Sequence, residues 1–399
     1  MPLFCPPFLK PLQRANRWFW LSAYLLGYMS ILLTRGGNAA LLPYLPRLAS
    51  VRRNLTTVTV SAAAPPQNRR HQLDMCRGRL TSERYCVEGN GDEWKESVVV
   101  VMGATGTGKS KLSIDLATMF AGEVVNSDKI QVYRGLDITT NKMPVPERCG
   151  VPHHILGELD PAVSELRPEA FREMAAGAIA GIAGRGLLPV LAGGSNSFIH
   201  AAMTGRYDPV RSPFAAGSRL LTRRDARALR YRCCFLSVDV NAVVLAEQLD
   251  RRVEEMVAAG MVEELGRYFA AEAEAGESRH PGLGKAIGVA EFREYFRGEG
   301  RGTAAAYEAA VAAIKANTRQ LAEEQVRKIE RLVEMGWPLR RVDATAAVAA
   351  RLAGEAAEAE AAWERDVAGP SATAVEQFLG EEVHVHHHHN IVSPPLLYT

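Results

Sequence analysis

The stretch Ser97–Phe120, SVVVVMGATGTGKSKLSIDLATMF, decides the fold. It opens with SVVVVM, a short run of mostly β-branched residues, which predicts a strand buried on both faces. A glycine-rich turn of the pattern G-x-x-x-x-G-K-S follows at 103–110. In the next stretch Leu112, Leu116 and Phe120 recur every four residues, as on the apolar side of a helix. Strand, glycine turn and helix in this order predict a loop that binds phosphate.

Each residue type of the predicted phosphate loop has a physical task. Glycines let successive backbone N–H groups converge on phosphate oxygens, and the helix N-terminus adds a partial positive charge. Lys109 supplies a full charge, and the Ser110 hydroxyl is the expected ligand of the cofactor Mg²⁺, which partly neutralises a di- or triphosphate. The residues expected to bind the diphosphate or nucleotide here are Gly103, Ala104, Thr105, Gly106, Thr107, Gly108, Lys109, Ser110 and Lys111.

The sequence after the loop disfavours a hydrolytic motor. Ordinary nucleotide hydrolases need an acid at the end of a second apolar strand to organise metal and water. The apolar run Leu187–Leu191 ends instead in AGGSN, without an acid. The other candidate acid, Asp239, comes late in the chain. A small-molecule kinase that uses Asp239 to organise its metal remains an alternative.

Another apolar run, GEVVNSD at 122–128, ends in Asp128. Ligands of open parallel sheets gather at the carboxyl edge of the strands. Asp128 is therefore expected close to the phosphate loop, where it can accept a proton or a hydrogen bond from an acceptor substrate. The alternative is an Asp that caps the next turn.

Composition separates the N-terminal part from the rest of the chain. The 399 residues are 47% hydrophobic and 23% charged, as in a globular protein. Residues 1–73 carry nine Lys or Arg and no acid, which leaves the remainder with 38 basic and 45 acidic residues, a net charge of −7. Such a remainder disfavours a nucleic-acid partner. The six cysteines form no C-x-x-C, so neither a zinc site nor a disulfide framework is indicated.

In the N-terminal extension 1–96, residues 1–73 have the acid-free, arginine-bearing composition of an organellar transit peptide, and a polar linker of mixed charge follows. The apolar run 18–33 is 16 residues long, shorter than the ~20 that normally cross a bilayer. A short anchor, a secretory signal and an inaccurate translation start are the alternatives for this run. We expect no stable membrane association.

Four ordered blocks, GATGTGKSKLSIDLA, GEVVNSDKIQVYRGLDITTNK, GVPHHILG and AGGSNSFIHA, resemble the plant adenylate isopentenyltransferases. These are the cytokinin synthases, relatives of the tRNA dimethylallyltransferases. The similarity runs from about residue 97 to residue 382. It implies that the exocyclic amine of adenine in ATP, ADP or AMP attacks the allylic carbon of dimethylallyl diphosphate, and that pyrophosphate leaves. It also implies a plastid (chloroplast) location, with the cytoplasm as the alternative.

The resemblance also implies roles for single residues. The phosphate loop cradles the leaving diphosphate, with Lys109 stabilising its charge, and Asp128 falls on the position of the general base. The residues that match a downstream active-site block or a basic position of the family, and are expected to bind diphosphate, are Asp137, Thr139, Lys142 and Arg252. One departure lies near residue 325, where the family pattern has a basic residue before Gln and this chain has Glu324.

The acceptor can also be considered from the sequence. The plant-type tRNA relatives tend to carry a C-terminal zinc finger, and no Cys follows Cys234. A free adenine nucleotide is therefore the expected acceptor, and a tRNA dimethylallyltransferase is the alternative. Dimethylallyl diphosphate and the nucleotide are the expected partners, nucleic acid is not expected, and we expect a monomer.

Together these features predict an α/β fold, a P-loop NTPase-like core with a parallel sheet and an inserted helical lobe. Strands are expected near residues 97, 122, 187, 232 and 337. The Ala- and Glu-rich stretch 344–368 is typical of a solvated helix. The expected regions are the extension 1–96, the catalytic core 97–240, the substrate-covering lobe 241–335, the C-terminal strand and helices 336–382, and a disordered His-rich tail 383–399.

Overall fold

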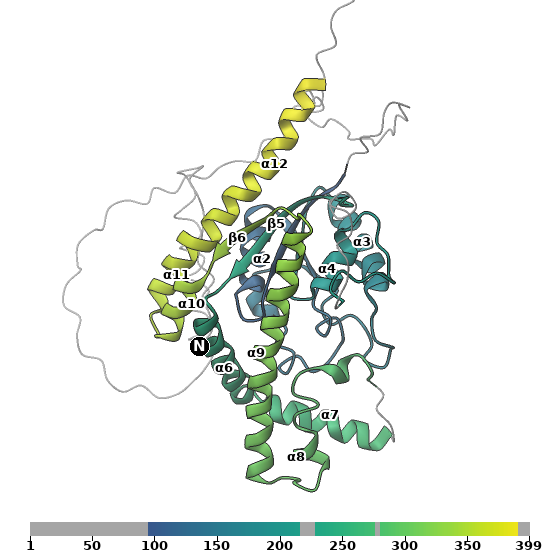
Figure 1. Cartoon of the computed structure of the whole chain (residues 1–399), viewed down its shortest axis with the longest axis vertical. Coiled ribbons are helices and arrows are strands. Elements are labelled where there is room, and N and C mark those ends of the chain that lie inside the picture. Colours follow the sequence, from purple (N-terminus) through teal and green to yellow (C-terminus); the bar gives the residue numbers. More distant parts are fainter. Residues whose placement is uncertain (1–94, 216–227, 276–279, 390–399) are drawn as a thin grey trace, which may run out of the picture. The chain divides into compact units, whose positions relative to one another are not determined.

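The computed structural model describes residues 95–215, 228–275 and 280–389, all of which belong to one compact unit. Their centre is a six-stranded parallel sheet in the order β3-β2-β4-β1-β5-β6 (Figure 1). The strands are β1 (Ser97–Gly103), β2 (Gly122–Asn126), β3 (His153–His154), β4 (Leu188–Ala192), β5 (Arg232–Asp239) and β6 (Leu339–Asp343). The expected transit peptide and its apolar run lie outside the described residues.

Strand β1 is buried on both faces, as its valine run predicts. Val99 and Val101 belong to one apolar cluster, whereas Val98, Val100 and Met102 belong to a second one. All five side chains are fully buried. Because neighbouring residues of a strand point to opposite faces, the sheet must be covered on both sides.

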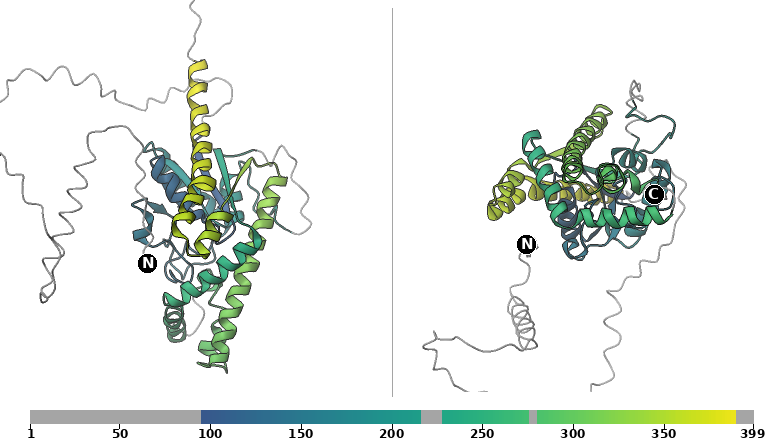
Figure 2. Two further views of the ribbon diagram at one scale, coloured as in Figure 1. Left: turned by 90° about the vertical axis from the view of Figure 1, so that its left-hand side faces the viewer. Right: turned by 90° about the horizontal axis from the view of Figure 1, so that it is seen from below.

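Helices supply the two covers (Figures 1 and 2). The smaller cluster is completed by α2 (Lys109–Met119), α10 (Thr345–Leu352), α11 (Ala356–Trp363) and α12 (Gly369–His389). The larger cluster includes side chains from α3 (Pro168–Ala183), α4 (Asn196–Met203) and α9 (Ala304–Glu334). This arrangement of helix layers around a parallel sheet is the predicted α/β fold.

The helical lobe follows β5 directly. It consists of α6 (Ala242–Ala258), α7 (Met261–Ala275), the short α8 (Arg293–Arg297) and α9. The side chain of Asn241 caps α6 by accepting from the Val243 N–H at 3.0 Å, and Thr303 caps α9 through the Ala306 N–H at 3.3 Å. Helix α9 packs on α6 and also touches β1, so it connects the lobe to the sheet.

Two parts of the fold differ from the expectations. Strand β3 was not predicted, because its two histidines carry no apolar pattern and pair only with the edge of β2. The stretch 344–368 is not a solvated helix, since α10, α11 and a π-helical turn at 364–368 bury Val348, Trp363 and Val367 against the sheet. Small alanines let these helices approach closely.

Two further observations concern the length of helices. The backbone of α12 continues past residue 382 to His389, so the expected boundary of the tail does not mark the end of this helix. In the described part of the chain, no helix has the length and apolarity required to span a bilayer.

Candidate active site

The phosphate loop joins β1 to α2, and its shape depends on glycine. Gly106 and Gly108 have φ angles of 84° and 97°, a left-handed region that side chains rarely adopt. A Cβ on Gly108 would stand 2.8 Å from the ring of Trp363, and one on Gly103 would stand 2.5 Å from the carbonyl oxygen of Val238. The glycines therefore give the loop both its turn and its close packing.

Hydrogen bonds within the loop gather on the carbonyl of Ala104. This oxygen accepts from Lys109 Nζ at 2.6 Å and from Thr107 Oγ1 at 3.0 Å. Two side chains from the helical lobe reach the neighbouring Thr105. Its N–H donates to Gln325 Oε1 at 2.7 Å, and its Oγ1 accepts from Arg252 Nη1 at 3.1 Å.

The charges at the loop form a small, mostly positive group. Removal from water, together with the positive charge of Arg252, lowers the pKa of Lys109 to about 7, and Asp128 opposes this shift. Removal from water likewise lowers the pKa of Arg252, again opposed by Asp128. The structure thus brings Lys109, Arg252 and Asp128 into one electrostatic unit, where an anion would stabilise both cations.

The capping role that was the alternative for Asp128 is present in the structure. Its Oδ1 caps the turn after β2, accepting from the N–H groups of Ile130 and Gln131 at 2.9 and 3.1 Å. Among the described residues, Oδ2 has no hydrogen-bond partner. One carboxylate oxygen therefore fixes the side chain, and the other remains available to a substrate amine.

The loop after β4 packs closely beside Asp128. A Cβ on Gly193 would lie 2.5 Å from the carbonyl carbon and the Oγ of Ser127, a residue that is fully buried. The Ser127 N–H donates to Ala192 O at 2.8 Å, and its carbonyl accepts from the Ser195 N–H at 3.3 Å. These hydrogen bonds and this close packing hold the ends of β2 and β4 next to each other at the carboxyl edge of the sheet.

The polar segment 137–142 is linked both to Asp128 and to the lobe. Gln131, whose N–H Asp128 caps, donates from Nε2 to Thr140 O at 3.0 Å. The buried Thr139 donates from its N–H and from Oγ1 to Glu264 of α7, at 2.8 and 2.6 Å.

Within this segment the charged side chains bind one another. Lys142, only 9% exposed, donates from Nζ to Asp137 Oδ1 at 2.7 Å and to Gly135 O at 2.6 Å. The predicted residues Asp137, Thr139 and Lys142 are thus engaged with protein partners, near the turn that Asp128 caps rather than within the loop.

Lys111 is directed away from the loop, toward the C-terminal helices. Its Nζ lies 3.2 Å from Asp115 Oδ2, 3.4 Å from Glu360 Oε1 and 4.8 Å from the centre of a Trp363 ring. Residues two apart on a helix do not face the same side. Lys111 therefore does not share the orientation of Lys109, although the two stand almost side by side in the motif.

Lys111→Met should lower stability by no more than about 1 kcal/mol, the usual limit for an exposed ion pair. The KM for the diphosphate substrate should be unchanged, because the Lys111 ammonium is directed to Asp115 and Glu360. Thermal denaturation and steady-state kinetics check this, with Lys109→Met as the comparison. An equal rise of KM in both variants would return Lys111 to the phosphate site.

Asp239, the acid of the kinase alternative, is occupied. Its Oδ1 accepts from Ser237 Oγ at 2.9 Å, and its Oδ2 lies 2.9 Å from Arg341 Nη1. The first contact lies within β5, and the second joins β5 to β6. This arrangement disfavours Asp239 as an organiser of a catalytic metal.

The residues present fit a Mg²⁺ ion that is held mainly by phosphate oxygens. Ser110 is exposed on the first turn of α2, beside Lys109. Across residues 95–215, 228–275 and 280–389, no group of three His, Cys, Asp or Glu side chains gathers to hold an ion. Mg²⁺ commonly takes one or two protein ligands and completes its shell with phosphate and water.

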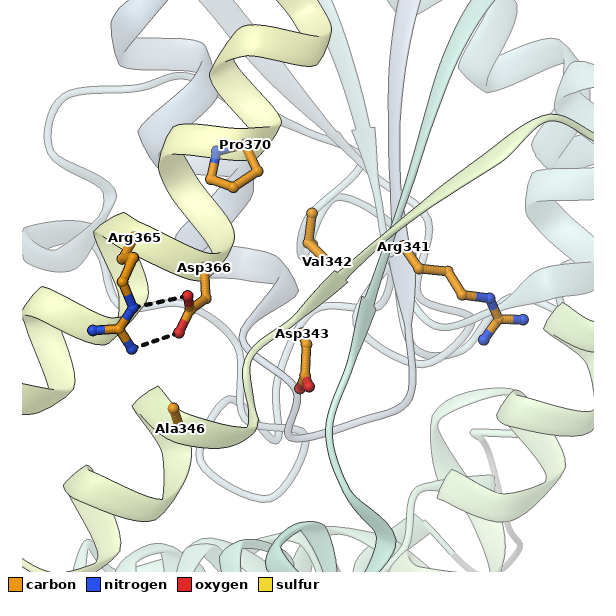
Figure 3. A pocket seen from close by; sticks show the side chains of 7 residues that line it. All are labelled: Arg341, Val342, Asp343, Ala346, Arg365, Asp366 and Pro370. Atoms are coloured by element: carbon orange, nitrogen blue, oxygen red, sulfur yellow. Dashed lines mark hydrogen bonds and ion pairs between the residues drawn. The ribbon is translucent and has the colours of Figure 1, made fainter.

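Two surface pockets are lined by residues other than those of the phosphate loop, Asp128 and Arg252. One, of about 500 Å³, is lined by Arg341, Val342, Asp343, Ala346, Arg365, Asp366 and Pro370 (Figure 3). It contains no predicted site residue, and Arg365 pairs with Asp366 at 2.7 Å. The other, of about 540 Å³, has Glu324 in its lining with Arg327, Lys328 and Arg331. Glu324 therefore lies among cations, whereas its neighbour Gln325 reaches the phosphate loop.

Two contributors to the site escaped prediction. Trp363 packs on Gly108 from 255 positions away, and Glu264 binds Thr139 from a different element. A lone Trp in an Ala- and Glu-rich stretch was the available signal for the first. For Glu264 the sequence offered none, since acids in the first turn of a helix are common.

Two protein-family models match this chain. The isopentenyl transferase family model matches residues 96–152, and the IPP transferase family model matches residues 131–229 and 212–331. An adenylate isopentenyltransferase of Humulus lupulus is 49% identical over 298 residues, which are 70% of this chain and 90% of that protein. Adenylate isopentenyltransferase 8, chloroplastic, of Arabidopsis thaliana is 45% identical over 304 residues, 73% of this chain and 90% of that protein.

Solved structures share the fold at lower identity. A eukaryotic dimethylallyltransferase acting on tRNA is 22% identical, with a TM-score of 0.58 over 72% of this chain and 80% of that one. The tRNA delta(2)-isopentenylpyrophosphate transferase of Staphylococcus epidermidis is also 22% identical, with a TM-score of 0.52 over 62% of this chain and 93% of that one. With a phosphate loop and Asp128 at one sheet edge and relatives of up to 49% identity, the chain belongs to the adenylate isopentenyltransferase family.

Proposed function

We propose that this protein transfers the dimethylallyl group of dimethylallyl diphosphate to the exocyclic amine of an adenine nucleotide, the first step of cytokinin synthesis. ATP or ADP is the expected acceptor, ahead of AMP. The observation that supports the proposal lies at the carboxyl edge of the sheet, beyond the ends of β1 and β2. There the negative charge of Asp128 acts on both Lys109 and Arg252, the cations proposed to bind the diphosphate. The names of the relatives support the same reaction.

The chemistry follows from the charges. The nitrogen of the amine forms a bond to the allylic carbon while the bond from that carbon to the diphosphate oxygen breaks. Negative charge collects on the departing pyrophosphate, and Lys109, Arg252 and the N–H groups of the loop stabilise it. Asp128 accepts the proton that the amine loses. Bound Mg²⁺, with Ser110 as its proposed ligand, would supply further positive charge to the diphosphate.

The alternatives are separated by residues of the fold. Phosphoryl transfer by a kinase requires a metal-organising acid, and both oxygens of Asp239 are engaged. The solved structures named for tRNA are 22% identical to this chain, and at that identity they show the fold rather than the acceptor. The net charge of −7 outside residues 1–73 disfavours a polyanion of that size.

A product assay tests the proposal. Purified protein is incubated with dimethylallyl diphosphate, Mg²⁺ and ATP, ADP, AMP or a short adenosine-containing RNA stem, and the products are identified by mass spectrometry. A five-carbon adduct on ATP or ADP, lost on chelation of Mg²⁺, is the expected result. ADP formed from ATP without an adduct would establish the kinase instead, and an adduct on the stem alone would establish the tRNA enzyme.

Plastid import is proposed for the same protein. Residues 1–73, which contain no acid, have the composition of a transit peptide, and several Arabidopsis relatives are named chloroplastic. A relative named mitochondrial makes the mitochondrion the alternative. A fusion of residues 1–96 to a fluorescent protein distinguishes the two organelles.

A further inference from the structure

Two side chains from outside the phosphate loop form hydrogen bonds with the same loop residue, Thr105. Gln325 of α9 accepts its N–H at 2.7 Å, and Arg252 of α6 donates to its hydroxyl at 3.1 Å. Both groups come from the helical lobe, 220 and 147 positions away in the chain. Thr105 is therefore the residue through which the lobe forms hydrogen bonds with the loop.

The side-chain amide of Gln325 is hydrogen-bonded at both its oxygen and its nitrogen. Oε1 accepts from the Thr105 N–H and Nε2 donates to the carbonyl of Gly194 at 3.1 Å, while the backbone carbonyl of Gln325 accepts from Asn196 Nδ2 at 3.1 Å. The residue is 7% exposed. A Cβ on Gly194 would lie 2.3 Å from Gln325 Nε2, so only glycine leaves room for this amide. One side chain thus connects the loop after β1 to the loop after β4.

Gln325 contacts the same peptide group that accepts a hydrogen bond from Lys109. The Ala104 carbonyl and the Thr105 N–H belong to one planar peptide unit. Gln325 binds the N–H of this unit, while its carbonyl accepts from Lys109 Nζ at 2.6 Å. Rotation of the peptide would move both groups at once. Gln325 therefore controls where the Lys109 ammonium rests before a diphosphate binds.

We propose that Gln325 is a positioning residue of the diphosphate site, which sets the Ala104–Thr105 peptide and, through it, the phosphate loop and Lys109. The role rests on the proposed function only in naming the diphosphate as the ligand. The N–H of Thr105 serves the protein rather than the ligand, and the remaining N–H groups of the loop are thereby held in a fixed arrangement toward phosphate. Such preorganisation lowers the cost of binding.

The test compares Gln325→Met and Gln325→Glu with the same changes at Gln320. Gln320 lies on the same helix, is exposed, and contacts only Glu324 at 3.4 Å. Binding of inorganic pyrophosphate with Mg²⁺ is measured by calorimetry, and amide hydrogen exchange is followed over residues 103–108. The KM values for dimethylallyl diphosphate and for ATP are measured separately.

Gln325→Met should weaken pyrophosphate about tenfold, the effect of one lost buried hydrogen bond. It should also raise the KM for dimethylallyl diphosphate and speed exchange in the loop, with little effect on the KM for ATP. In Gln325→Glu the carboxylate repels both the Gly194 carbonyl and the anion. Its affinity should recover as the pH falls, because a protonated carboxyl can donate to Gly194 as the amide did. Both Gln320 variants should behave as the unchanged protein.

Unaltered pyrophosphate affinity and exchange in Gln325→Met would overturn the proposal, as would equal losses at Gln320. A Gln325→Glu variant whose affinity changes with pH no more than that of the unchanged protein would also contradict it, and this isosteric change keeps the test valid where the Met variant folds poorly. Loss of pyrophosphate affinity in a protein that makes no prenylated nucleotide would support the positioning role and refute the proposed function. The two failures are thus distinguishable.

Discussion

Asp128→Asn should lower turnover by ~10²- to 10⁴-fold, the usual effect of losing a general base. The affinity for inorganic pyrophosphate should fall little, because Asn retains an oxygen that can accept from the Ile130 and Gln131 N–H groups. The turn after β2 and the neighbouring phosphate loop therefore keep their shape. What the variant lacks is the second oxygen as a proton acceptor, and with it the ability to deprotonate the attacking amine.

Asp343→Asn is the matched control for this prediction. Asp343 also ends a strand and caps the following turn, accepting from the Thr345 N–H at 2.9 Å, but it lies on β6 in the pocket of Figure 3. Single-turnover product formation and pyrophosphate binding are measured for both variants. Unchanged turnover in Asp128→Asn would remove Asp128 from the chemistry, and equal losses in both would indicate damage to the sheet.

Most strands of the sheet were predictable because they have a recognisable local sequence pattern. The expected starts near residues 97, 122, 187, 232 and 337 fall within two residues of β1, β2, β4, β5 and β6. Strands β1, β2, β4 and β5 contain short apolar runs, as burial on two faces requires, whereas the edge strand β6 carries two exposed arginines. Strand β3 was missed because an edge pair of two residues needs no such run. The stretch 344–368 was misjudged because composition does not show which side of an Ala-rich helix meets a partner.

The residues of the site were predictable only where a single local sequence motif contains them. The glycine loop and Asp128 follow from strand ends that a parallel sheet brings to one edge. Contacts across the chain do not follow in this way. Nothing local pairs Trp363 with Gly108 or Gln325 with Thr105, and the sequence singled out Gln325 only as the residue after Glu324, the departure from the family pattern. Lys111 shows the opposite case. It stands next to the motif in the sequence, but this position does not fix the direction in which its side chain leaves the helix.

Lys109→Met should lower kcat by about 10² to 10³, the range for removing one group that stabilises transition-state charge, and should weaken pyrophosphate binding as well. In the unchanged protein, the same lysine predicts a pH dependence. With a pKa of about 7, its ammonium is present below that pH and is lost as the pH rises through it. The kcat/KM for dimethylallyl diphosphate should therefore fall above about pH 7. The kcat should fall less, because a bound diphosphate keeps the proton on Lys109.

Arg252 provides the test of this assignment, since its positive charge is one cause of the lowered pKa of Lys109. Arg252→Gln should reduce kcat/KM at every pH and move the fall to higher pH, because the repulsion that favours neutral Lys109 is gone. Arg251→Gln, one position away and exposed, should leave the inflection in place. An inflection that persists in Lys109→Met, or that does not move in Arg252→Gln, would assign the titration to another group. A shift in Arg252→Gln alone would establish that the lobe, through α6, sets the charge of the lysine that receives the leaving pyrophosphate.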